Sequence, residues 1–202
     1  GGVFQRFEQL FDDLLGAVVR DGLRDTGLEM ILQQDAIDAL ERRFERVWIL
    51  TQNVDGLHAL AGSQNLVELH GNLLRARCEA CGKRFPLPEA FAPPPFCPAC
   101  GHRARPDVVW FGEFLPEGAW ERAERAFAEA DFALVVGTSA EVEPAASLGR
   151  IAFASGAYLV EVNPEPTPLT PLAHLSLRTG AVEGMALLLP PSPEDQAEGH
   201  LS

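Results

Sequence analysis

The sequence predicts an α/β fold in which helices flank a mainly parallel sheet and a small metal-bound piece is inserted. Three observations support this prediction. In the second half, apolar segments of strand length alternate with segments of helical pattern, which is typical of βαβ units and a parallel sheet. In the first half, a buried strand, a turn and a short helix follow one another. Between the halves, paired cysteines lie in a proline-dense segment that cannot be a regular interior element.

The composition is that of a globular chain, either one large domain or one domain with a small insert. It has 202 residues, of which 47% are hydrophobic. Acidic residues number 29 against 16 lysines and arginines, so the formal net charge is −13. This balance argues against direct nucleic-acid binding, because phosphate recognition needs clustered cations. It fits a small-molecule ligand or a basic polypeptide partner, or it serves only solubility.

The sequence shows no charged segment followed by an apolar leader, and no apolar run near the roughly 20 residues that span a bilayer. All four cysteines fall into pairs, with none left over. We therefore expect a cytoplasmic protein without a membrane partner. In that reducing compartment the cysteines would serve as metal ligands rather than disulfides.

In the first half, the elements are predicted from apolar periodicity. Residues 3–19 and 28–44 carry apolar side chains three and four positions apart, which predicts two amphipathic helices. Val47–Thr51 is a short apolar run of the kind found in buried strands. A turn then leads into a short helix that ends at Gly62. Leu66–Leu69 predicts a further short strand.

In the second half, helices and strands alternate. The predicted order is a helix at Glu117–Ala130, a strand at Phe132–Ser139, a helix at Pro144–Ser155 that begins with proline, a strand at Ala157–Thr167, and a last short strand and helix.

Three parts of the chain follow from this order. Residues 1–72 and 109–189 would form one discontinuous domain, the helix-flanked sheet. Residues 73–108 would form a loop-rich insert, held together by metal instead of by its own core. Residues 190–202 have the composition of a tail, and we expect them to be disordered.

Two Cys-x-x-Cys pairs, Cys78 with Cys81 and Cys97 with Cys100, are separated by fifteen residues. Such pairs can bring four thiolates to the corners of a tetrahedron around Zn²⁺. A glycine directly follows each pair, where a tight knuckle needs a small residue. Because sulfur would fill every corner, we expect one structural zinc ion and no catalytic metal.

Polar or small residues follow three predicted strands, at the carboxyl ends where open α/β sheets bind ligands. They are Gln52, Asn53 and Asp55, then Gly137, Thr138 and Ser139, and finally Asn163 and Glu165. Together they could line one crevice for a ligand rich in hydroxyls and phosphates. Helix capping would explain several of them equally well. The glycine fingerprints GxGxxG and GxxxxGK are absent from this sequence.

Two further features stay open on the residues alone. His70, in the turn "ELHGN", is either a general base, which its ordinary pKa of about 6.5 would allow, or a structural turn histidine. Val108, Trp110 and Phe111 belong to an aromatic strand edge. This edge either accepts an extended peptide by strand addition or packs into the core.

Six motifs, in this order, resemble the sirtuins, which are NAD-dependent protein lysine deacylases. They are TQNVDGLH, ELHGNL, the paired Cys-x-x-Cys, RPDVVWFGE, VVGTSAEVEPAAS and VNPEPTPL, and they extend over about Val47 to Leu189. The resemblance implies a Rossmann-like domain and a small zinc-ribbon domain. NAD, as cosubstrate, and an acyl-lysine protein or peptide would meet between the two.

The resemblance also implies residue roles. His70 would be the general base that acts on the nicotinamide ribose. The nicotinamide and its ribose would be held by Gln52, Asn53 and Asp55, phosphate and ribose by Gly137, Thr138 and Ser139, and the adenosine side by Asn163 and Glu165. The acyl-lysine tunnel would be lined by Val108, Trp110, Phe111 and Gly112, and zinc would be bound by Cys78, Cys81, Cys97 and Cys100. The implied reaction transfers the acyl group to ADP-ribose and releases nicotinamide and free lysine.

The sequence departs from the sirtuin pattern at two places. The N-terminal Gly-Ala-Gly-x-Ser loop and the Phe-Arg lid are absent from it, so we interpret the chain as an N-terminally shortened member. Since that loop is the family's main diphosphate cradle, the alternative is a catalytically impaired remnant that keeps the zinc ribbon and the peptide-binding edge. Glu141 and Glu143 stand where apolar residues are commoner, and they either favour basic peptides or face solvent.

Overall fold

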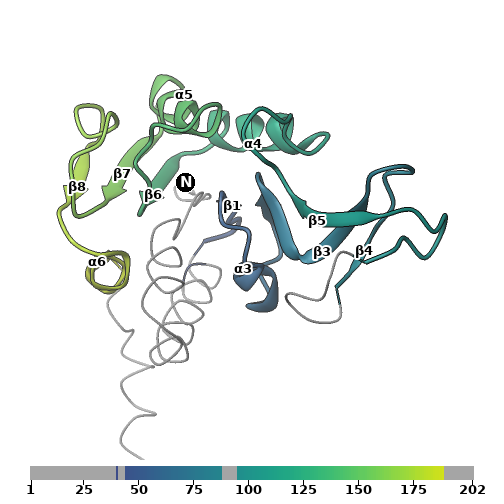
Figure 1. Ribbon diagram of the computed structural model, residues 1–202. Coiled ribbons are helices and arrows are strands. Elements are labelled where there is room, and N and C mark those ends of the chain that lie inside the picture. The colour runs from purple at the N-terminus through teal and green to yellow at the C-terminus, as the bar shows by residue number, and fades with distance from the viewer. Residues whose placement is uncertain (1–39, 41–43, 88–94, 189–202) are drawn as a thin grey trace, which may run out of the picture.

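The computed structural model describes residues 40, 44–87 and 95–188, and within these ranges the strands form three sheets (Figure 1). Two of the sheets are parallel, β1–β2 and β6–β7–β8, and the third is antiparallel with the order β4–β3–β5. The strands are β1 (Ile49–Thr51), β2 (Leu66–Glu68), β3 (Gly71–Cys78), β4 (Arg84–Pro86), β5 (Ala104–Val108), β6 (Phe132–Val136), β7 (Tyr158–Val162) and β8 (Leu175–Leu177).

Helices connect β1 to β2 and β6 to β7, which confirms the predicted α/β fold. The helices are α3 (Leu57–Leu60), α4 (Ala119–Ala128), α5 (Leu148–Ala154), which follows the short 3₁₀ helix η1 (Ala145–Ser147), and α6 (Ala181–Leu188). The predicted elements of the second half are present with shorter bounds. For example, the strand expected over residues 132–139 ends at Val136, and Gly137 then adopts a positive φ of 65°.

Both faces of β6 and β7 are buried, as expected for parallel strands between helices, whereas the edge strand β8 is partly exposed. Along β6, Ala133 and Val135 join one apolar cluster, while Leu134 and Val136 join another. Helices α4 and α5 cover the first face and α6 covers the second (Figure 1). Strand β1 also contributes residues to both clusters. It therefore belongs to the same layer as β6, although no ladder joins the two within the described ranges.

The antiparallel sheet projects from this body as an arm (Figure 1), and it corrects the expectation of a loop-rich insert. In β3, Ala76 and Cys78 are buried while Arg75 and Arg77 are half-buried. The proline-dense stretch before Cys97 suggested a loop for the whole segment, but β3 and β4 precede that stretch and β5 follows it. The arm begins where Gly71 pairs with Val108.

Several expectations fall outside the described ranges. The helices predicted over residues 3–19 and 28–44 lie outside these ranges, except for Leu40 and Phe44. Leu40 is helical and buried. The tail predicted over residues 190–202 lies entirely outside the described ranges. In the part of the chain that the structure describes, no helix has the length and apolarity required to cross a bilayer.

Candidate functional site

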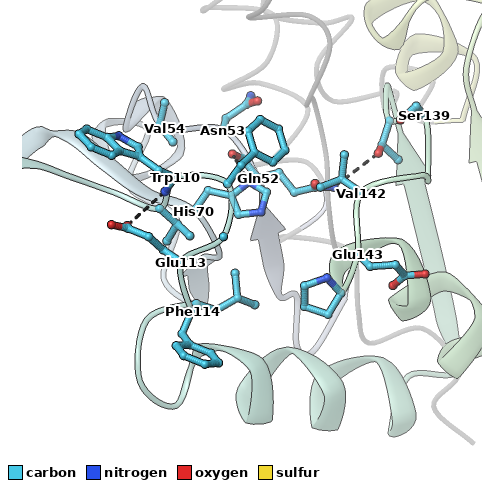
Figure 2. Close-up of a pocket in the computed structure, with 16 residues that line it drawn as sticks. Gln52, Asn53, Val54, His70, Trp110, Glu113, Phe114, Ser139, Val142 and Glu143 are labelled. Carbon is cyan, nitrogen blue, oxygen red and sulfur yellow. Dashed lines mark hydrogen bonds between the residues drawn. The ribbon is translucent and has the colours of Figure 1, made fainter.

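A cavity of about 550 Å³ opens beside the carboxyl ends of β1 and β6 (Figure 2). Four chain segments surround it: the turn after β1, the turn after β2, the loop after β5, and the segment after β6. Its lining residues are Gln52, Asn53, Val54, His70, Val109, Trp110, Phe111, Gly112, Glu113, Phe114, Leu115, Thr138, Ser139, Val142, Glu143 and Pro144.

The structure brings the three predicted strand ends together at Thr138. Its hydroxyl oxygen lies 3.5 Å from Nε2 of Gln52, which follows β1. Its carbonyl oxygen accepts a hydrogen bond of 3.3 Å from Nδ2 of Asn163, which follows β7. The hydroxyl also accepts the backbone N–H of Ala140 at 3.2 Å. One buried threonine therefore connects residues that are 86 and 25 positions away in the chain.

His70 lies in the cavity wall, between the aromatic loop and the end of β1 (Figure 2). Its Nδ1 is 3.2 Å from the carbonyl oxygen of Gln52. Because a carbonyl oxygen can only accept, this contact favours the tautomer with the proton on Nδ1 and leaves the lone pair on Nε2. Burial lowers the pKa of His70 below its ordinary 6.5, against a smaller opposing effect of the Gln52 carbonyl. A neutral imidazole at neutral pH is the form that can accept a proton.

Gly71 fixes the backbone next to this histidine. Its φ of +83° is a left-handed conformation, and a Cβ at this position would lie 2.0 Å from the carbonyl oxygen of Asp107. Only glycine allows β3 and β5 to approach this closely. On the other side, the N–H of Val109 donates to the carbonyl oxygen of His70 at 2.9 Å. The histidine is therefore held between β1 and the end of β5.

Asp55 does not line the cavity. Its Oδ1 accepts the backbone N–H of Leu57 at 2.8 Å, which makes a turn just before α3; the N-cap of α3 is Gly56, which makes no side-chain cap hydrogen bond. Burial raises the pKa of this carboxyl above its ordinary value. Gly137 and Val108 also lie outside the lining, at the ends of β6 and β5.

The two predicted residues after β7 lie behind the cavity. Asn163 is buried, whereas the side chain of Glu165 is exposed, and neither lines the cavity. Arg178 holds this segment, because its Nη1 donates to the carbonyl oxygens of Asn163 at 3.2 Å and Glu165 at 3.0 Å. Its Nη2 donates to the buried carboxylate of Glu161 at 2.9 Å, which also accepts the hydroxyl of Ser176.

The aromatic edge is exposed, which excludes core packing for Trp110 and Phe111, while peptide binding at this edge stays a prediction. Trp110 is 57% exposed, and Phe111 and Phe114 are 98% and 97% exposed. Several lining residues were not marked by the sequence patterns. Glu113 and Phe114 continue the aromatic motif and could have been found by extending it, whereas nothing in the sequence marks Val54, Leu115, Val142 or Pro144 as neighbours of His70.

The four cysteines form the predicted metal site. Their sulfur atoms all lie within 4.8 Å of one another, with separations of 3.4 Å between Cys78 and Cys100, 3.5 Å between Cys81 and Cys100, and 3.7 Å between Cys81 and Cys97. Thiolates at about 2.3 Å from a tetrahedral Zn²⁺ would be about 3.8 Å apart, so the set fits one zinc ion. The backbone N–H of Cys81 donates to the sulfur of Cys78 and is the main cause that lowers the pKa of that thiol to about 6.

Comparisons with known proteins agree with this arrangement. The Sir2 family profile matches residues 20–144. A Thermus thermophilus protein named NAD-dependent protein deacylase is 99% identical over 154 residues, which cover 76% of this chain and 61% of that protein. A solved Sir2 homologue–NAD complex is 46% identical with a TM-score of 0.74, over 78% of this chain and 62% of the other.

A third relative is a solved complex of Sir2 with a p53 peptide and NAD⁺. It is 33% identical with a TM-score of 0.70, and the match covers 85% of this chain and 70% of the other. By comparison with the Thermus relative, the chain spans about 61% of that protein's length. The family profile covers more than half of the chain, and the two solved neighbours share its fold at 46% and 33% sequence identity. The chain therefore belongs to the Sir2 family.

Proposed function

We propose that this chain carries the site of an NAD-dependent protein lysine deacylase. The observation that carries the proposal is the meeting of three strand ends at Thr138, next to a neutral His70, in one cavity with an exposed aromatic wall. The names of the relatives support it, since the Thermus protein is called a deacylase and the solved neighbours hold NAD or an acetylated peptide.

The donor set fits the polar parts of NAD. Gln52 and Asn53 present amide groups in the cavity wall, which suits the nicotinamide and its ribose, and we assign Asp55, which follows them in the same turn, to the same part of the ligand. At the end of β6, a glycine with positive φ leaves room for close approach of phosphate, and Thr138 and Ser139 follow it. We assign phosphate and ribose to Gly137, Thr138 and Ser139, and the adenosine side to Asn163 and Glu165.

When bound, NAD supplies a ribose carbon for the acyl oxygen to attack as nicotinamide leaves, and a ribose hydroxyl that finally receives the acyl group. His70 contributes the base, because its Nε2 lone pair can accept the proton of that hydroxyl. One water molecule is consumed overall, and the products are free lysine, nicotinamide and O-acyl-ADP-ribose. The zinc ion has no part in this chemistry. We propose a structural role for it, since four sulfur ligands leave no open position.

The loop after β5 is our candidate for the substrate side. Trp110, Phe111 and Gly112 line the cavity, and Val108 lies at the strand end where an extended peptide could add its backbone. We further propose that the substrate is basic. The support is the net charge of −13 on the whole chain and the position of Glu143 at the cavity, where its side chain is 56% exposed and its carboxylate pairs with Arg150 at 2.9 Å.

We assign residues 1–72 and 109–189 to the NAD-binding domain and residues 73–108 to the zinc-ribbon domain. The start of the arm at Gly71 and its end at Val108 support this division. We also propose a cytoplasmic location. Its support is the cysteine set, because four thiolates gathered for a metal suit a reducing compartment.

The test incubates the chain with NAD and an acetyl-lysine peptide and follows nicotinamide release. We expect release that depends on the peptide and is lost in His70→Ala. Release no greater than in that variant would overturn the proposal for this chain. Peptide binding without release would support the non-catalytic alternative described above.

A further inference from the structure

The loop from Val108 to Glu113 carries large apolar side chains that have almost no packing support. Phe111 is 98% exposed and Trp110 is 57% exposed, and Gly112 turns the backbone with a φ of +87°. Inside the loop, one backbone hydrogen bond of 2.9 Å runs from the N–H of Glu113 to the carbonyl oxygen of Trp110. A loop of this kind has little apolar burial to define its conformation, so other contacts must hold it.

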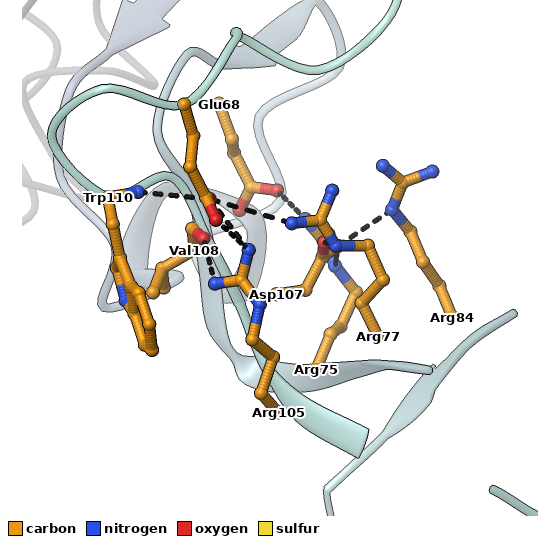
Figure 3. A network of polar contacts seen from close by, with 9 residues as sticks. Glu68, Arg75, Arg77, Arg84, Arg105, Asp107, Val108 and Trp110 are labelled. Atoms are coloured by element: carbon orange, nitrogen blue, oxygen red, sulfur yellow. Dashed lines mark hydrogen bonds and ion pairs between the residues drawn. The ribbon is translucent and has the colours of Figure 1, made fainter. Parts of the chain in front are cut away.

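Arg105, on β5, makes those contacts with a single side chain (Figure 3). Its Nη1 donates to the carbonyl oxygen of Val108 at 3.1 Å, at the start of the loop. Its Nη2 donates to Oε1 and Oε2 of Glu113 at 2.5 and 2.6 Å, at the end of the loop. The guanidinium carbon lies 4.5 Å from the ring centroid of Trp110, in the middle. The Arg105 side chain is only 13% exposed.

Glu113 completes the arrangement. Its Oε2 accepts the backbone N–H of Trp110 at 3.2 Å, so both partners of the ion pair bind the loop backbone. The hydrogen bond from Arg105 holds the pKa of this carboxyl below its ordinary value. Arg77 approaches Glu113 at 3.6 Å and Asp107 at 3.7 Å, and thereby connects the loop to β3 of the arm (Figure 3).

We propose that Arg105 is a positioning residue for the substrate peptide, acting with Glu113 to hold the loop at Val108–Glu113 in the conformation that receives an acylated peptide. The proposal rests on the function proposed above. When the loop is already ordered, peptide binding does not have to supply the free energy of ordering it. Loss of the ion pair should therefore weaken peptide binding. Arginine suits this task because its planar fork can reach a carbonyl, a carboxylate and a ring face together, which an ammonium cannot.

The experiment compares Arg105→Ala, Arg105→Lys and Glu113→Gln in the full chain, with Arg103→Ala as matched control. Arg103 is an exposed arginine two positions earlier, and it forms no ion pair among the described residues. For Arg105→Ala we expect the KM for an acetyl-lysine peptide to rise about tenfold, with kcat and the KM for NAD changed less than about twofold. Arg105→Lys should recover part of the loss. The control should match the unchanged chain.

A second readout is amide hydrogen exchange at Trp110, whose N–H is bonded to Glu113. Arg105→Ala and Glu113→Gln should lose protection there, while protection in β6 stays the same. Equal peptide KM and equal Trp110 exchange in the variants and the unchanged chain would overturn the proposal. If the unchanged chain releases no nicotinamide, the proposed function fails, and Trp110 exchange alone then decides whether Arg105 holds the loop. Should Arg105→Ala fail to fold, Glu113→Gln provides both readouts.

Discussion

Replacing Gly71 with alanine tests how the structure holds His70. The backbone at this position has a φ of +83°, and the new Cβ would lie 2.0 Å from the carbonyl oxygen of Asp107. The left-handed conformation alone costs a residue with a Cβ about 1–2 kcal/mol. The overlap is with backbone, so the paired strands β3 and β5 must move apart, and a shift of this kind costs about 1–3 kcal/mol.

We therefore expect Gly71→Ala to lower the free energy of unfolding by about 3 kcal/mol. At about 2–4 °C per kcal/mol for a chain of this size, Tm should fall by roughly 6–12 °C. Gly62→Ala is the matched control, because Gly62 has a φ of +86° but no described atom within 4 Å of the added Cβ. It carries the conformational cost without the overlap and should lose about 1–2 kcal/mol.

Thermal unfolding followed by circular dichroism measures both variants. The reasoning predicts a clearly larger loss of Tm for Gly71→Ala than for Gly62→Ala, together with weaker nicotinamide release, since His70 precedes the shifted residue. Equal losses of Tm in the two variants would refute the claim that close approach to Asp107 requires glycine here.

Three further predictions concern the metal, the histidine and the segment after β7. Removing zinc with a chelator, or replacing Cys97 with serine, should lower Tm and abolish stoichiometric zinc, measured by metal analysis, because metal binding supplies folding free energy. The pH profile of kcat/KM should fall at low pH with a midpoint below 6.5, as His70 becomes protonated. Arg178→Ala should lower the free energy of unfolding by about 2–4 kcal/mol in a denaturant titration, because the carboxylate of Glu161 is 1% exposed and loses its cation.

For each of these three predictions, one result would contradict the stated reason. Unchanged Tm after zinc removal would show that the arm folds without metal. A midpoint at or above 6.5 would contradict the effect of burial on the His70 imidazole. A change within about 0.5 kcal/mol for Arg178→Ala, which is typical of a surface substitution, would show that the hydroxyls around Glu161 suffice.

Local patterns were enough to predict the parallel strands and the metal ligands. The end of β6 was marked by an apolar run that stops at a glycine and two hydroxyls, and the meeting of the strand ends follows from parallel topology. Cysteine spacing alone specified the metal set, because the knuckle geometry is local.

The arm and its ion pairs could not be predicted in the same way. They depend on the register that places Asn72 opposite Asp107, with an irregularity between Asn72 and Ala76. No local pattern encodes such a register, so the approach of Gly71 to Asp107 was missed. The contact of Arg105 with Glu113, eight positions later, depends instead on how the loop after β5 folds back on that strand. The exposure of Trp110 was also undetermined, because an aromatic run has the same sequence pattern in a core strand and at a free edge.

The most direct test of the central claim is mass spectrometry of an acetyl-lysine peptide incubated with the chain and NAD. We expect the acetyl group to leave lysine and appear on ADP-ribose, with nicotinamide in equal amount, and His70→Ala to yield none of these products. Deacetylation that proceeds without NAD, or acetyl recovered only as free acetate from the first moments, would contradict it.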